Sequence, residues 1–133
     1  MSMTRRFQDL VEVTDSDIQM ALQRSDPGEL ALVSITVALL SDDPAGAQDL
    51  CLLLGANDDP RVRAHAIMCL GHLARRFRKL DQQRVRPLIE TSLREDDAYV
   101  RDLAHSAADE IHQFLGWDFS GHVYGERKEQ RAL

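Results

Sequence analysis

The dipeptide Asp-Pro recurs in the first half of the chain, as Asp26-Pro27, Asp43-Pro44 and Asp59-Pro60, at intervals of 17 and 16 residues. An aspartate is a favourable N-cap, because its carboxylate accepts hydrogen bonds from the free amides of the first helical turn. Proline suits the first helical position, where no donor is needed. Asp81 and Asp97 continue the spacing, and Thr14 with Asp17 forms an earlier candidate cap. The spacing predicts helices near 15–24, 27–41, 44–55, 60–78, 82–94 and 98–116, with a further N-terminal helix near 3–12.

Two of these predicted helices are near copies of each other. The stretch "DDPRVRAHAIMCLGHLARRF" begins at residue 58, and "DDAYVRDLAHSAADEIHQFL" begins at residue 96. An offset of 33 also aligns residues 64–66 with residues 31–33. A lone helix pair cannot bury its apolar face, whereas stacked pairs share a core, so periods in the thirties predict an all-α stack of helix pairs. We expect one domain over 1–133, with repeats at about 14–41, 43–78 and 81–116 and an irregular tail over 117–133.

These repeats resemble the HEAT-repeat family over about residues 14–116. Two features support the resemblance. Val-Arg stands early in the second helix of the last two repeats, preceded by acids at 58–59 and 96–97, and the stretch "AIMCLGHLA" is rich in small residues. The first unit departs from the pattern, since Glu29-Leu30 stands in place of Val-Arg. The resemblance implies a short right-handed α-solenoid of three stacked HEAT-like helix pairs. It also implies that Arg63 and Arg101 bond acids of the same or the adjacent repeat.

Composition favours a soluble globular protein, with 44% hydrophobic and 29% charged residues among 133. No apolar run approaches the roughly 20 residues that a membrane span needs, and no secretory signal follows the N-terminal arginines. Cys51 and Cys69 lie within apolar helical patterns. We therefore expect a cytoplasmic protein with reduced packing cysteines, a disulfide being the alternative.

The net charge of −6 is unevenly distributed. Residues 57–95 carry nine basic and five acidic side chains, whereas the flanking segments are acidic, and "RRFRKL" is the densest basic run. An acidic chain binds nucleic acid poorly unless its basic residues share one face. We interpret the run as a solvated inter-helix turn, and we expect neither nucleic acid nor membrane as a direct partner.

A helix beginning at Pro60 separates its residues into stripes. The predicted core stripe holds Val62, Ala66, Cys69, Leu70, Leu73 and Phe77, flanked by small or apolar Ala64, Ile67, Gly71 and Ala74. The remaining stripe is predicted to be exposed and holds Arg61, His65, Met68, His72, Arg75 and Lys79. By the resemblance, second helices line a concave groove, and the matching positions of the last repeat are Tyr99, Leu103, Ser106, Glu110 and Gln113, followed by Trp117.

The first repeat places Leu32, Ile35 and Leu39 at the same positions. Two interpretations remain open for these apolar side chains. They line an apolar end of the groove, or the N-terminal helix covers them through Phe7, Leu10 and Val11.

Metal and catalytic motifs are weak. His65 and His72, like His105 and His112, are separated by about 10 Å along a helix, too far to share one ion. His105, Asp109 and His112 share a face, but the sequence supplies no further ligand. The chain lacks the repeated His-Glu pairs of deoxyhypusine hydroxylase, a phosphate loop and a nucleophile elbow. We therefore expect no metal, no cofactor and no enzymatic activity.

The small size and acidic charge of the chain and the sequence pattern of its helices resemble those of bacterial HEAT-like immunity proteins. These proteins belong to contact-dependent inhibition and related polymorphic toxin systems. That resemblance implies stoichiometric binding of a cognate toxin domain, with a nuclease as one candidate. The predicted partner-binding residues are Arg61, His65, Met68, His72, Arg75, Tyr99, Asp102, Leu103, Ser106, Asp109, Glu110, Gln113 and Trp117. A scaffold for a cellular protein is the alternative, and a HEAT-like lyase, hydroxylase or DNA glycosylase is the third hypothesis.

Overall fold

The computed structural model describes residues 14–123, and this range contains six helices and no strand. The helices are α2 (Asp15–Arg24), α3 (Pro27–Leu40), α4 (Pro44–Leu54), α5 (Pro60–Phe77), α6 (Gln82–Ser92) and α7 (Ala98–Leu115). The all-α prediction is confirmed, and the predicted ends of these helices differ from the observed ones by one or two residues at most. The helix predicted near 3–12 lies outside the described residues.

Each helix begins at the predicted cap. The Thr14 hydroxyl accepts a hydrogen bond from the Asp17 amide at 3.1 Å, and the Asp17 side chain in turn accepts from the Thr14 amide, which completes a capping box. The carboxylates of Asp26, Asp43, Asp59, Asp81 and Asp97 each accept from an amide of the helix that follows. Local hydrogen bonding therefore fixes where every described helix starts.

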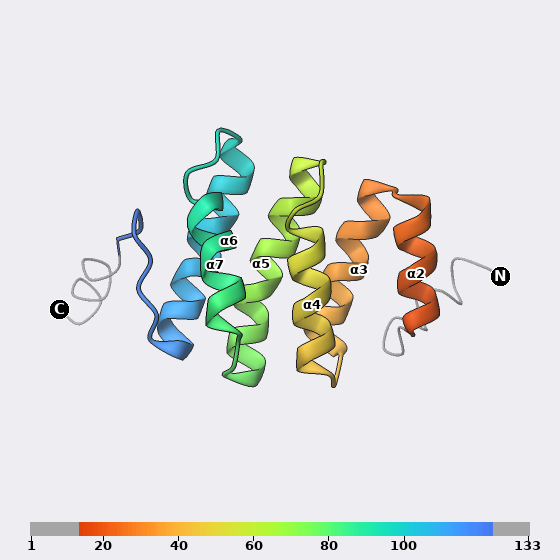
Figure 1. Ribbon diagram of the computed structural model, residues 1–133, viewed down its shortest axis with the longest axis horizontal. Coiled ribbons are helices and arrows are strands. Elements are labelled where there is room, and N and C mark those ends of the chain that lie inside the picture. The colour runs from red at the N-terminus through yellow and green to blue at the C-terminus, as the bar shows by residue number, and fades with distance from the viewer. Residues whose placement is uncertain (1–13, 124–133) are drawn as a thin grey trace.

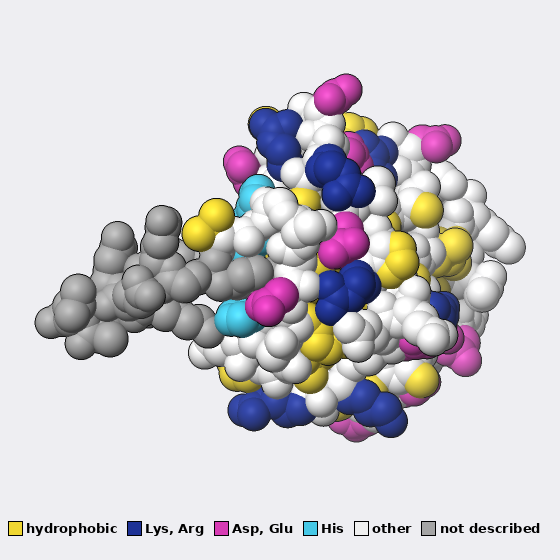
Figure 2. Space-filling model, turned by 60° about the vertical axis from the view of Figure 1, so that its left-hand side comes forward, with side chains coloured by type: hydrophobic (Ala, Val, Ile, Leu, Met, Phe, Trp, Pro, Cys, Tyr) yellow, Lys and Arg dark blue, Asp and Glu magenta, His cyan; other side chains and the backbone are white. Residues whose placement is uncertain are grey.

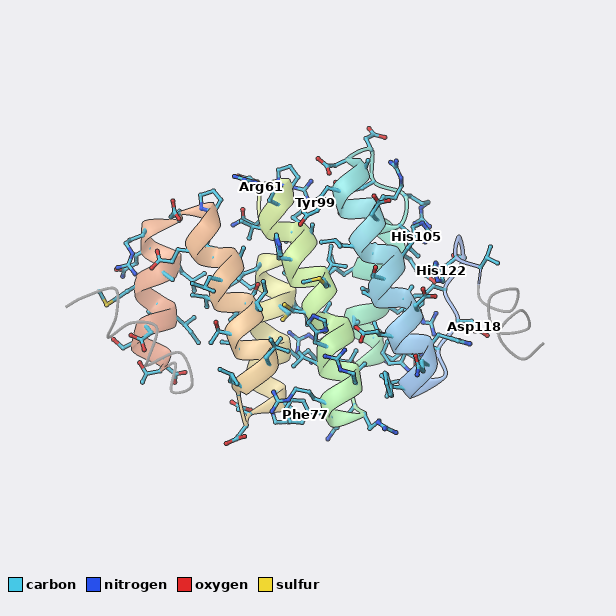
Figure 3. The ribbon with its side chains drawn as sticks, turned by 180° about the vertical axis from the view of Figure 1, so that it is seen from behind. Arg61, Phe77, Tyr99, His105, Asp118 and His122 are labelled. Carbon is cyan, nitrogen blue, oxygen red and sulfur yellow. The ribbon has the colours of Figure 1, made fainter. Side chains whose placement is uncertain are left out.

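The helices follow one another across the molecule, from α2 at one end to α7 at the other (Figure 1). Consecutive helices α2 and α3, α4 and α5, and α6 and α7 contact each other. Helix α5 also packs against α3 on one side and, most extensively, against α7 on the other. The helices form two layers. Figures 1 and 3 show α4 and α6 in one layer and α3, α5 and α7 in the other.

Helix α5 supplies the centre of the apolar core. All of its predicted core and flanking residues are buried except Phe77. Phe77 lies in the last turn, where its ring is half-buried and carries the Arg76 guanidinium 4.5 Å from its centroid. Phe77 packs against the apolar core as predicted but is not fully buried, and the Arg76 cation lies over its ring.

Arg63 links two inter-helix turns. Its guanidinium donates to both carboxylate oxygens of Glu95, at 2.9 and 2.7 Å, and to the backbone oxygens of Asn57 and Asp58. Arg101 donates to the backbone oxygens of Glu95 and Asp96. The ladder implied by the resemblance is therefore observed for Arg63, which pairs with an acid, whereas Arg101 bonds carbonyl groups rather than carboxylates.

The two cysteines are free thiols buried in the core between α4 and α5. A hydrogen bond from Cys69 and burial together raise the pKa of the Cys51 thiol well above its usual value. The predicted packing role is confirmed, because a buried thiol with a raised pKa is a poor nucleophile. Among the residues that the structure describes, no helix has the length and apolar character required to cross a bilayer.

Candidate protein-binding surface

The surface shared by α5 and α7 contains most of the predicted partner-binding residues. Six of them are exposed, namely Arg61, Arg75, Tyr99, Asp102, Ser106 and Gln113. The other seven, His65, Met68, His72, Leu103, Asp109, Glu110 and Trp117, are half-buried. The stripe on α5 is thus exposed at its ends and not continuously as predicted, because α7 packs alongside it and covers the middle.

At one end of this surface, His65 holds Tyr99 in place. The His65 Nδ1 lies 2.8 Å from the backbone oxygen of Arg61, and its Nε2 lies 3.3 Å from the Tyr99 hydroxyl. Because a carbonyl oxygen can only accept, Nδ1 carries the hydrogen, and Nε2 of the neutral ring then accepts from the hydroxyl. The two rings meet edge to face at 5.8 Å, and Tyr99 remains 44% exposed between α5 and α7 (Figure 3). This arrangement presents an aromatic ring in a fixed orientation.

Further along the surface, Glu110 of α7 pairs with Arg75 of α5 and lies close to His72 of the same helix. Its Oε2 lies 2.6 Å from Arg75 Nη1, and its Oε1 lies 3.4 Å from His72 Nδ1. The second contact is a close approach rather than a hydrogen bond, since His72 Nδ1 is buried without a hydrogen-bond partner. Burial lowers the pKa of His72, and Arg75 acts in the same direction while Glu110 opposes it. His72 is therefore neutral near pH 7, and Glu110 serves the packing of α5 on α7.

The basic run at the end of α5 is used inside the molecule. Arg76 donates to the backbone oxygen of Ala38 at 2.9 Å, and the Arg78 guanidinium lies 4.9 Å from the centre of the Phe114 ring. Arg78 adopts a left-handed conformation with φ 56° and ends the helix. The run covers the last turn of α5 and the turn after it, so the prediction of a solvated inter-helix turn fits Arg78 and Lys79 but is wrong for Arg76. Figure 2 shows basic, acidic and apolar side chains interspersed on the face that includes the C-terminal side of the molecule.

The chain after α7 folds back along α6 and α7. Phe119 is 3% exposed, and the Arg86 guanidinium of α6 lies 5.6 Å from the Trp117 ring centre and 5.2 Å from that of Phe119. Arg86 also donates to the backbone oxygen of Asp118, while His112 of α7 donates to that of Trp117 at 3.0 Å. Trp117, one of the predicted partner-binding residues, is thus half-buried in an irregular segment that packs on the last two helices.

Two histidines and one aspartate meet beside this segment. His122 Nε2 lies 2.6 Å from Asp109 Oδ1, and His122 Nδ1 lies 2.6 Å from Nδ1 of His105 (Figure 3). Sequence reasoning placed His105 and Asp109 on one helix face but missed His122. The contact depends on the chain reversing direction after Gly116, and no periodic pattern reports such a reversal. Within residues 14–123, no group of three or more His, Cys, Asp or Glu side chains could hold a metal ion.

The opposite end of the molecule has a hollow of about 380 Å³ between α2, α3 and α4. Apolar Ile18, Val37 and Leu40 line it together with polar and acidic side chains. Of the apolar groove positions predicted for the first repeat, Leu32 and Ile35 are half-buried and Leu39 is 43% exposed. The side chains predicted to cover them, Phe7, Leu10 and Val11, lie outside the described residues.

Comparison of this chain with protein-family models, curated proteins and solved structures found no match.

Proposed function

We propose that the chain is a protein-binding module whose α5–α7 surface docks another protein. The observation that carries this proposal is Tyr99, an aromatic ring that is 44% exposed while its hydroxyl is held by His65. Binding energy at interfaces concentrates in aromatic and Arg anchors, and an anchor that is already ordered loses little side-chain entropy on binding. Arg61 and Arg75 stand exposed on the same surface.

The proposal includes the architecture implied by the resemblance, a right-handed HEAT-like solenoid of three helix pairs. The contacts between α2 and α3, α4 and α5, and α6 and α7 support it, as do the packing of α5 between α3 and α7 and the Arg63–Glu95 pair. In such a stack each helix pair packs only on the neighbouring pairs, and the second helices of successive pairs form one face of the stack. In this chain that row is α3, α5 and α7.

For the partner, we propose a cognate bacterial toxin domain, bound stoichiometrically by the chain as an immunity protein. The similarity to small HEAT-like immunity proteins motivates this step, and the net charge of −6 is consistent with a cationic target such as a nuclease site. Opposite charges on two partners raise the rate of their encounter. Three of the predicted partner-binding residues are acids that could meet such a site. Asp102 is exposed, whereas Asp109 and Glu110 already pair with His122 and Arg75.

A general scaffold for a cellular protein would use the same surface, so the partner must be found by experiment. The chain is co-expressed with the product of the gene directly upstream of its own, and any complex is isolated and titrated. We expect a one-to-one complex that weakens with salt and abolishes toxicity. A cellular protein recovered in place of the toxin would favour the scaffold.

The same titration tests the surface. Tyr99→Ala should weaken binding by about 1–3 kcal/mol, since it removes an ordered anchor. Leu53→Ala is the matched control, because Leu53 is 57% exposed on α4, in the other layer of helices. If Tyr99→Ala bound the partner as tightly as the wild-type chain while Leu53→Ala bound it more weakly, the binding site would lie on the layer that contains α4.

A further inference from the structure

Residues 117–123 are held on α6 and α7 by three kinds of contact. One is apolar, with Phe119 buried and Arg86 stacked near it and Trp117. The second is a pair of hydrogen bonds from Arg86 and His112 to backbone oxygens of the segment. The third is a polar chain that runs from Asp109 through His122 to His105. The His122 side chain is only 6% exposed, so its bonds are formed away from bulk water.

The geometry of the polar chain limits how many protons it can hold. Nδ1 of His105 and Nδ1 of His122 are 2.6 Å apart, a distance that accommodates one hydrogen between them. When both rings are neutral, His122 donates through Nε2 to Asp109 and accepts at Nδ1 from His105. When His122 is an imidazolium, it donates from both nitrogens, to Asp109 and to the lone pair of His105. Both states keep the chain of hydrogen bonds intact.

A second proton cannot be accommodated in this way. With both rings charged, two N–H groups face each other across 2.6 Å and two positive charges adjoin. We propose that residues 117–123 form a latch on α6 and α7 that opens when the His105–His122 pair takes up this second proton. Opening separates His122 from His105 and exposes the Phe119 ring, which is buried in the closed state. The latch does not rest on the binding function proposed above, although Asp109 and Trp117 are among the predicted partner-binding residues.

The charges around the pair favour its closed state at neutral pH. Burial lowers the pKa of His105, and His122 and Arg101 act in the same direction, while Asp102 and Asp109 oppose them. From α6, Arg86 and Glu90 approach the latch segment, with Glu90 lying 3.5 Å from the Ser120 amide. His112 of α7 lies 3.0 Å from an Asp118 carboxylate oxygen.

Trp117 reports on the latch directly, because it is the only tryptophan of the chain. The experiment measures tryptophan emission and acrylamide quenching of the full chain between pH 7.5 and 5, with far-UV circular dichroism recorded in parallel. We expect acidification to shift the emission to longer wavelength and to increase quenching, while the helical signal is retained. An emission spectrum that is the same at both pH values would overturn the proposal.

Variants separate the histidine pair from other titrating groups. His105→Gln keeps a polar side chain but cannot take up the proton, so the transition in Trp117 emission should be lost. His72→Gln is the matched control, because His72 also has a lowered pKa but lies between α5 and α7, and it should keep the transition. Persistence of the transition in His105→Gln, or its coincidence with loss of helix, would refute the latch.

Discussion

Gly71 shows how one residue sets the approach of two helices. A β-carbon at this position would lie 2.7 Å from Glu110 Oε1 and 3.1 Å from the Cα of Ala107. The carboxylate can move aside, but the backbone of α7 moves only if the whole helix does. The absence of a side chain at Gly71 therefore allows α5 and α7 to pack closely enough to bring Arg75 and Glu110 together.

We predict that Gly71→Ala destabilises the fold by on the order of 1 kcal/mol, as overpacking outweighs the gain in helix propensity. Urea unfolding followed by circular dichroism measures this difference. Gly28→Ala is the matched control, since its β-carbon would lie an unstrained 3.4 Å from Asp26 Oδ2 and only the gain in propensity applies. An equal stabilisation of both variants would contradict the close approach.

Residues whose environment is set by their own helix were predictable. The buried stripe of α5 follows from a 3.6-residue period, and the N-caps follow from side chains adjacent in sequence. Two kinds of residue were not predictable. The half-burial of Phe77 depends on which side chains pack around the last turn of α5, and the contacts of His122 depend on where an irregular segment turns back. Neither property is encoded in a local pattern.

At the scale of helices and turns, Arg63 joins the turn before α5 to the turn before α7. Its bonds to Asn57 and Asp58 fix it to its own turn, and its two bonds to Glu95 cross to the next. The side chains of this pair are 21% and 23% exposed, so water screens the pair less than it screens a surface pair.

A double-mutant cycle over Arg63→Met and Glu95→Gln should give a coupling free energy on the order of 1 kcal/mol, near the upper end for ion pairs of this kind. The cycle over Arg84→Met and Asp49→Asn provides the comparison. Those side chains are 51% and 60% exposed at a separation of 2.9 Å, and their coupling should be close to zero. Equal couplings from denaturant unfolding would show that the Arg63 pair gains nothing from its partial burial.

The whole molecule shows where local sequence patterns stop determining structure. Six helix starts follow from capping residues, and the order of the helices follows from their repetition. The exposure of the stripe on α5 cannot be predicted from such local patterns, because it depends on how closely α7 packs against α5. Half-burial of His65, Met68 and His72 is a property of that packing. The same packing brings Glu110, a predicted docking residue, against Arg75 and His72.

Because α5 and α7 form the most extensive helix contact, the state of His72 between them affects the stability of the whole fold. Burial lowers its pKa in the folded state below the value of about 6.5 that a free histidine has. The unfolded chain then binds the proton more readily, so acidification favours unfolding. The contribution of neutral His72 to stability is complete above about pH 6.5 and is lost as the pH falls through the lowered value.

We predict that the urea midpoint of the wild-type chain falls between pH 7.5 and 5.5, above the range in which ordinary carboxylates titrate. His72→Gln should reduce this fall, since glutamine keeps a polar side chain and takes up no proton. His105→Gln should retain the part of the fall that His72 causes, because its proton acts on the latch segment. If the midpoint of His72→Gln followed pH as steeply as that of the wild-type chain, His72 would not be held neutral by its position between α5 and α7.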